Sequence, residues 1–257
     1  MHHPELPSVD DYLASLDAAV DRMAVWSRAA GPDAPVPTCP GWTVRDLLAH
    51  QGMVHRWATA VVRADPAGVD DVAVEAEGRA AGNPVAWLLD GAGPLVAALQ
   101  AAPDDLAVMT FLKQAPPARQ FWARRQCHET TVHALDALAA RGQRPLTSDD
   151  VWLSTDLATD GVDELLVGFW QRRTKGPRSE TPYTATVSVT DGPAWRLDVT
   201  DQAPVTRRHD SHDGLAGART LSGTAADLYL ALWNRGGVVD DPTGLLDEWR
   251  ERAAVTW

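Results

Sequence analysis

The 257-residue chain has little lysine, cysteine, phenylalanine and tyrosine, and it has no excess of positive charge. Lys113 and Lys175 are the two lysines among 23 basic residues, and 35 acidic residues give a net charge of −12. Nucleic acids and anionic membranes both select a basic surface, so neither is an expected partner. The sequence also lacks any apolar run near the roughly 18 residues that span a bilayer. We therefore expect no association with membranes.

The two cysteines, Cys39 and Cys127, are too few for a disulfide framework, which fits a reducing cytosol. The first residues, MHHPELPSVDD, lack the basic and apolar regions of a secretory signal peptide. Both features predict a cytoplasmic protein. The oligomeric state, monomer or dimer, stays open at this stage.

The first part of the chain has the apolar spacing and the start signals of four helices. These helices are expected over Ser8–Ala30, Thr43–Arg63, Pro84–Gln100 and Pro117–Arg141. Four helices with no strand pattern between them predict a four-helix bundle. The acidic connection from Ala64 to Asn83 is expected to be a crossover loop or partly ordered.

The pattern changes after Gly142. One more helix is expected over Ser148–Arg172, and then two alternating β-branched segments, 183–190 and 195–200, flank a hairpin turn at Asp191-Gly192. Further extended pieces near 204–208 and 218–221 precede two helical segments, 224–234 and 245–252. We therefore predict two domains, a bundle over residues 1–142 and an α+β domain over residues 143–257.

A candidate metal site lies on two of the predicted helices. Glu129 and His133 are four residues apart, so their side chains leave one helix face together. His50 falls on the apolar face of the second helix and could supply a third ligand. Two histidines and one glutamate leave a coordination position open, as in catalytic zinc sites.

Ordinary structural roles compete with this interpretation. A Glu and a His at this spacing are commonly a solvated pair, and a single His on an apolar face is commonly a satisfied core residue. However, Arg125 and Asp136 share the predicted core stripe with Glu129, and buried charges are costly unless they are paired or bind a metal. The combination favours a metal site.

Two segments resemble a known family. Thr38-Cys-Pro-Gly-Trp-Thr-Val-Arg-Asp-Leu-Leu-Ala-His50 and Arg124-Arg-Gln-Cys-His-Glu-Thr-Thr-Val-His133-Ala-Leu-Asp136 are similar to motifs of the mycothiol-dependent maleylpyruvate isomerases. That family belongs to the wider DinB/YfiT-like metal-binding bundles. A third segment, Leu221 to Arg235, resembles the end of its second domain, a small α+β module similar to sterol carrier protein 2.

The resemblance implies a set of site residues. It makes His50, Glu129 and His133 the ligands of a divalent metal, with zinc preferred. It makes Arg235 the candidate for a catalytic arginine of the second domain. Arg125 is a further catalytic candidate, and Arg125 and Asp136 also suit a role in orienting a ligand or closing the pocket. An interhelical ion pair is the alternative for these two residues.

The implied cofactor is mycothiol, the low-molecular-weight thiol of actinobacteria, and the scarcity of lysine fits their GC-rich genomes. The thiol would attack a small electrophilic substrate, either isomerising it from cis to trans, as with maleylpyruvate, or remaining on it as an S-conjugate. Two alternatives stay open. One is a metal-assisted hydrolase or lyase of the same fold that does not use mycothiol. The other is a non-enzymatic protein that binds a metal and a small molecule.

Overall fold

The computed structural model describes residues 6–172, 175–212, 215 and 218–253, which form two compact units. The helical unit comprises residues 7–110 and 115–144. The α/β unit comprises residue 6, residues 111–114 and the described residues from 145 onward. Within the described residues, no helix has the length and apolar character needed to cross a membrane.

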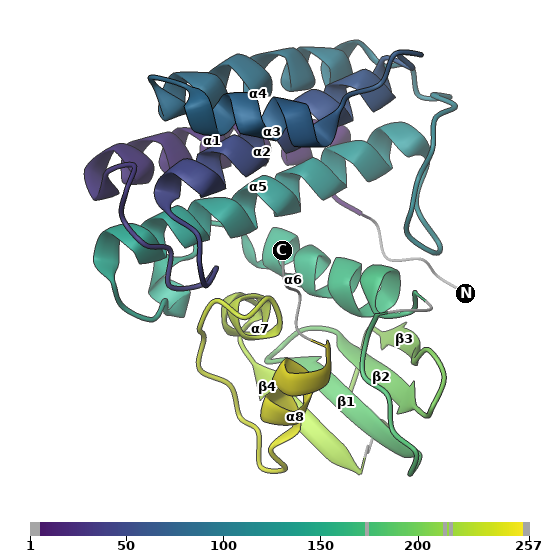
Figure 1. Ribbon diagram of the computed structural model, residues 1–257. Coiled ribbons are helices and arrows are strands. Elements are labelled where there is room, and N and C mark those ends of the chain that lie inside the picture. The colour runs from purple at the N-terminus through teal and green to yellow at the C-terminus, as the bar shows by residue number, and fades with distance from the viewer. Residues whose placement is uncertain (1–5, 173–174, 213–214, 216–217, 254–257) are drawn as a thin grey trace. The chain divides into compact units, whose positions relative to one another are not determined.

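The helical unit is a four-helix bundle with one additional helix (Figure 1). Its elements are α1 (Val9–Ala30), α2 (Val44–Val62), α3 (Asp71–Ala80), α4 (Pro84–Ala101) and α5 (Ala118–Gly142). Helix α1 packs against α5 and α4, and α2 packs against the same two helices, which closes the bundle. The predicted fold class is therefore confirmed.

Side-chain caps determine where the first two bundle helices begin. The hydroxyls of Ser8 and Thr43 accept the backbone N–H groups of Asp11 and Asp46, whose carboxylates return to the cap residues. These reciprocal bonds satisfy N–H groups that have no partner within the helix. Both starts agree with the sequence-based prediction.

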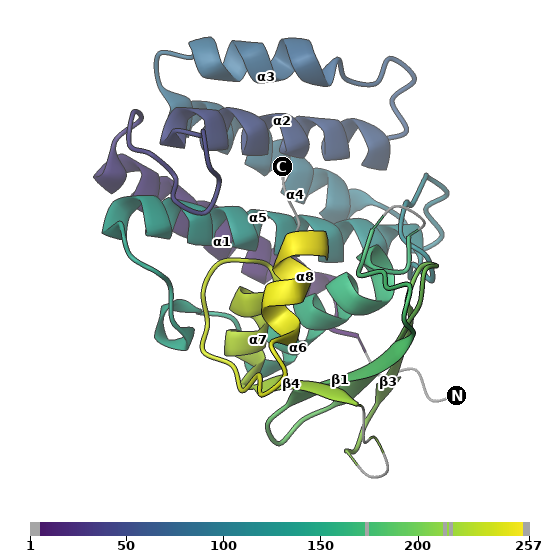
Figure 2. The ribbon, with the colours of Figure 1, turned by 60° about the horizontal axis from the view of Figure 1, so that its bottom comes forward.

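Helix α3 was not predicted, because its segment was expected to be a loop or partly ordered. Asp70 caps it by accepting the N–H of Ala73. The helix has no apolar stripe: Gly78 is its one buried residue and Val72 is 76% exposed. Hydrophobic periodicity therefore gave no signal here. The figures show α3 running alongside α2, on the outside of the bundle (Figures 1 and 2).

Helix α5 also differs from its prediction. One buried stripe was expected, but every residue from Phe121 to Ala137 is buried. Cys127, which the helical periodicity directs away from the stripe, is fully buried as well. The buried polar side chains of this helix include Glu129, His133 and Asp136. Since such groups are costly without partners, their contacts define the site described below.

The α/β unit begins with a break where one continuous helix was expected over Ser148–Arg172. A short 3₁₀ turn (Ser148–Asp150) is followed by α6 (Thr155–Asp163), and α6 continues into a π-helical segment (Glu164–Phe169). Ser154 starts α6 by accepting the N–H of Leu157. The break therefore reflects a second cap that competes with helix propagation from residue 148.

A four-stranded mixed sheet completes this unit. Its strands are β1 (Tyr183–Val189), β2 (Ala194–Val199), β3 (Val205–His209) and β4 (Arg219–Gly223), in the spatial order β3-β2-β1-β4. Strand β1 pairs antiparallel with β2 and parallel with β4. Helices α7 (Ala225–Leu232) and α8 (Leu245–Ala253) pack against β4, and the π-helical segment packs against β3. The four expected strands are thus present.

Candidate metal centre

Three donor side chains of the helical unit converge. His50 comes from α2, and Glu129 and His133 come from α5, one turn apart. Glu129 Oε1 lies 3.4 Å from His133 Nε2 and 3.9 Å from His50 Nε2. One ligand atom from each residue lies within 4.8 Å of the other two. The three residues that the sequence singled out therefore meet at one point.

These separations suit a divalent cation. Donors at 2.0–2.2 Å from a tetrahedral ion are roughly 3.3–3.6 Å apart from one another. The distance between Glu129 and His133 falls in that range, and the distance to His50 is slightly longer. Two imidazole nitrogens and one carboxylate oxygen are also the donor types that zinc accepts. The residues present therefore fit a bound metal.

Arg125 controls the second oxygen of Glu129. Its NH2 group donates to Glu129 Oε2 at 2.9 Å, along one helix, and both side chains are buried. Burial alone would raise the pKa of Glu129, but His133, His50 and Arg125 hold that pKa well below its ordinary value. Glu129 is therefore a carboxylate, and its Oε1 faces the two histidines.

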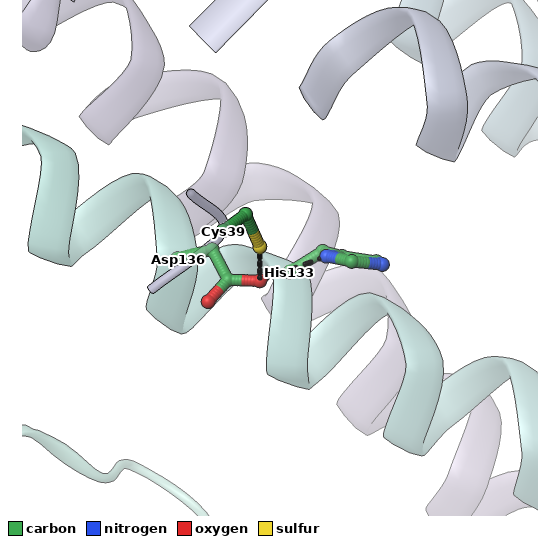
Figure 3. Close-up of side chains that lie close together, drawn as sticks. All are labelled: Cys39, His133 and Asp136. Carbon is green, nitrogen blue, oxygen red and sulfur yellow. Dashed lines mark hydrogen bonds and ion pairs between the residues drawn. The ribbon is translucent and has the colours of Figure 1, made fainter. Parts of the chain in front are cut away.

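Asp136 holds the other side of His133 (Figure 3). His133 Nδ1 lies 2.9 Å from Asp136 Oδ2, and Cys39 Sγ donates to the same oxygen at 3.4 Å. Thr38 Oγ1 donates to Asp136 Oδ1 at 2.5 Å. Burial lowers the pKa of His133, but Asp136 and Glu129 together raise it above the ordinary value. A proton on Nδ1 leaves Nε2 as the nitrogen that can bind a cation.

Trp42, in the loop before α2, places its aromatic ring beside the two histidines of the cluster. The Trp42 ring lies 5.1 Å from the ring of His50 and 6.2 Å from that of His133, measured between centroids. It stacks on His133 with an interplanar angle of 22°. Trp42 therefore restricts the orientation of both imidazole rings.

A buried polar network lies in the next turn of α2. His55 Nε2 is 2.8 Å from Gln51 Nε2 and 2.9 Å from Thr130 Oγ1. Complete burial lowers the pKa of His55 to about 3, against partial opposition from the charge of Glu129. His55 is therefore neutral at physiological pH and is not part of the convergent donor set.

Arg235 belongs to the α/β unit and follows α7. Its side chain is 2% exposed, and its NH1 group donates to the carbonyl of Trp233 at 2.6 Å. The backbone on both sides is tightly constrained: Asn234, Gly236 and Gly237 all have positive φ. A Cβ atom on Gly236 would lie 2.3 Å from the carbonyl oxygen of Leu146, so only glycine fits there. The chain thus holds Arg235 in a rigid segment.

Sequence reasoning missed part of the surroundings of the donor cluster. Thr38 and Cys39 were quoted as part of a motif, but their contacts with Asp136 were not predicted. The carboxylate of Glu75 on α3 lies 3.8 Å from His50 Nδ1 and was also missed. The spacing of Glu75 and Arg79, four residues apart, was an available helix signal.

The fold and the site together define a class of protein, in which a helical bundle with a donor cluster that could hold a cation is joined to a small α/β unit. Residues 12–138 match the family described as "Mycothiol maleylpyruvate isomerase N-terminal domain". Residues 156–256 match the "MDMPI C-terminal domain". The chain belongs to the mycothiol maleylpyruvate isomerase family.

Solved structures support the same fold. The chain is similar to the crystal structure of a mycothiol-dependent maleylpyruvate isomerase, with 14% identity and a TM-score of 0.59 over 93% of this chain and 94% of that chain. A mutant of such an enzyme, with one histidine replaced by alanine, gives a TM-score of 0.61 at the same identity and coverage. No curated protein sequence matches the chain.

Proposed function

We propose that this protein is a metal-dependent isomerase that uses mycothiol to convert a maleylpyruvate-type substrate from cis to trans. The observation that carries the proposal is the convergence of His50, Glu129 and His133 at distances suited to one cation. Membership of the family supports mycothiol as the thiol. The names of the similar solved structures support the isomerisation.

His50 Nε2, His133 Nε2 and Glu129 Oε1 would hold the metal. A divalent cation, with zinc preferred for this donor set, stabilises a thiolate over a thiol near neutral pH. Arg125 keeps Glu129 ionised and occupies its second oxygen, so a single oxygen is presented to the cluster. Asp136 fixes the ring of His133 with Nε2 directed toward Glu129.

When bound, mycothiol would supply a thiolate nucleophile for the conjugated carbon–carbon double bond; rotation about the resulting single bond and expulsion of the same thiolate would return the free thiol and the trans product. Addition to that bond moves negative charge onto the neighbouring carbonyl oxygen. A positioned guanidinium stabilises such a charge. We propose Arg235 for this role, because its segment is rigid and its position matches the family motif. Arg125 is already paired with Glu129, so its role is to orient this proposed metal ligand and not to act on the substrate.

The test combines metal analysis with turnover. Wild type is expected to hold close to one zinc per chain, and His50→Ala to lose it. A His212→Ala variant changes an exposed histidine of the α/β unit and should keep both metal and activity. Equal metal content in wild type and His50→Ala would contradict the ligand assignment.

Turnover of maleylpyruvate is measured with and without mycothiol, and the products are analysed by mass spectrometry. Isomerisation predicts a trans product of unchanged mass and full recovery of the thiol. Accumulation of an S-conjugate would instead indicate a transferase. Turnover that does not depend on mycothiol would contradict the proposed cofactor. Arg235→Gln should lower turnover and leave the metal content unchanged.

A further inference from the structure

Glu75 places a second carboxylate beside His50, on the side away from Glu129. Its Oε2 lies 3.8 Å from His50 Nδ1, whereas His50 Nε2 lies 3.9 Å from Glu129 Oε1. The two nitrogens of the imidazole ring therefore face two different carboxylates. Both side chains are mostly buried, with 16% of His50 and 19% of Glu75 exposed.

The other histidine of the cluster has the same arrangement. His133 Nε2 faces Glu129 Oε1, and His133 Nδ1 faces the carboxylate of Asp136. Each histidine thus directs Nε2 to the shared Glu129 and Nδ1 to a carboxylate of its own. Asp136 lies on the same helix as His133, but Glu75 comes from the separate helix α3.

Polar contacts hold α3 in the register that presents Glu75. Arg79 pairs with Glu75 Oε1 and also donates to Asp46, the residue that closes the capping box of α2, at 3.0 Å. Arg45 at the start of α2 donates to the carbonyls of Arg79 and Ala81. Arg79 therefore restrains one carboxylate oxygen of Glu75, while Oε2 is the oxygen nearest His50.

Apolar packing contributes less than these polar contacts to holding α3 in its register against α2. Gly78 is the one buried residue of α3, and its Cα approaches α2 so closely that a Cβ would lie 2.9 Å from Ala49 Cα. This contact sets the distance between the helices. Glu77 on the same helix is exposed, whereas Glu75 is turned inward. Arg79 pairs with Oε1 of this inward-facing carboxylate, and Oε2 is the oxygen that lies within 3.8 Å of His50 Nδ1.

We propose that Glu75 is a positioning residue for the metal site and accepts a hydrogen bond from the Nδ1–H group of His50. Such an outer carboxylate fixes the tautomer that presents Nε2 and makes that nitrogen more basic. Closing the contact to hydrogen-bond length requires a shift of about 1 Å in a long side chain. The inference rests on the proposed metal ligands and assigns α3 a part in metal affinity.

The test compares two glutamates on one helix. Zinc affinity of the full chain is measured by competition with a chromophoric chelator for wild type, Glu75→Ala, Glu75→Gln and Glu77→Ala. Loss of an outer carboxylate weakens metal binding by about 10- to 100-fold, which is the expected effect of Glu75→Ala. Glu77→Ala removes the same charge from an exposed position and should leave the affinity unchanged. Glu75→Gln should fall between them, because its amide oxygen can still accept a hydrogen bond from Nδ1–H.

A spectroscopic measurement separates this role from a general effect on α3. In zinc-loaded protein labelled with ¹⁵N-histidine, the Nδ1–H signal of His50 should shift in Glu75→Ala and stay in place in Glu77→Ala. If Glu75→Ala and Glu77→Ala bind zinc equally well, or if the His50 signal does not move, the inference is wrong and the metal site stands. If wild type binds no zinc, or His50→Ala binds it equally, the metal site is wrong and the inference falls with it.

Discussion

Asp136 offers the sharpest test of how this site is built. The carboxylate is fully buried and lies close to three potential donors, on Thr38, Cys39 and His133. Asp136→Asn keeps the shape of the side chain but replaces one acceptor oxygen with an NH₂ group. This group cannot accept a hydrogen bond from the neighbouring donor. Two effects should follow, a loss of stability and a loss of metal affinity.

The size of each effect follows from the contacts. Hydrogen bonds to a charged group contribute about 1.5–3 kcal/mol each, and the Cys39 thiol is a weak donor. Asparagine keeps one acceptor oxygen, so Asp136→Asn loses one of the bonds from Thr38 and His133 together with the charge. We expect it to lower the free energy of unfolding by about 3–5 kcal/mol, as when one partner of a buried pair is lost. His133 would also lose the acceptor that orients it, so the metal affinity should fall by about 10- to 100-fold.

The loss of stability in the metal-free protein should depend on pH. Asp136 helps to raise the folded-state pKa of His133 above its value of 6.5 in the unfolded chain. The stabilisation from a raised pKa is fully present below the unfolded value and disappears as the pH rises through the folded value. The difference between wild type and Asp136→Asn should therefore be larger at pH 6 than at pH 9.

Urea unfolding of the metal-free proteins and chelator competition at low temperature measure the two effects separately. Thr38→Val is the matched control, because it removes one bond to Asp136 and leaves the contact with His133. It should cost about 1.5–3 kcal/mol of stability, the contribution of one hydrogen bond to a charged group, and leave the metal affinity nearly unchanged. If Asp136→Asn binds zinc as tightly as Thr38→Val does, the assignment of Asp136 as the residue that orients His133 is refuted.

Two further predictions concern the packing around the site. The pKa of His55 is about 3 in the folded protein, so the unfolded chain gains a proton first as the pH falls from 6.5 toward 3. This linkage should cost wild type about 2 kcal/mol between pH 7 and pH 5, and urea unfolding of His55→Gln should show a smaller loss. Gly78→Ala should lower the melting temperature although alanine favours helices, because its Cβ would lie 2.5 Å from Trp87 Nε1 and 2.9 Å from Ala49 Cα. A higher melting temperature would show that α3 is loosely docked.

Much of the fold was readable from local signals. Ser8 and Thr43 marked helix starts because a capping hydroxyl acts within three residues. The alternation of Trp195, Leu197 and Val199 with polar residues marked β2. Helix α3 gave no comparable signal, since Gly78 is its one buried residue and apolar periodicity needs a stripe.

The sequence predicted some residues of the donor cluster more directly than others. Glu129 and His133 are one turn apart, so helical geometry alone brings their side chains together. His50 lies far away in sequence. Its position on the apolar face of the second helix made it a possible third ligand, and the resemblance of its motif to a known family then assigned it to the set. Asp136 was identified as an unusual charge on a buried face, but not as the partner of Thr38 and Cys39.

Local sequence signals predicted the bundle helices, the strands of the second unit and the proximity of Glu129 and His133 on α5, because each depends on contacts within a few residues. Tertiary structure alone decided that Trp42 stacks on the histidines and that Glu75 reaches His50 from a peripheral helix. The valines and alanines of α3 are not buried, so no buried apolar stripe marked that helix for pattern analysis. Its position is set instead by polar contacts and one close glycine approach between distant segments, and no periodicity along the chain records such contacts.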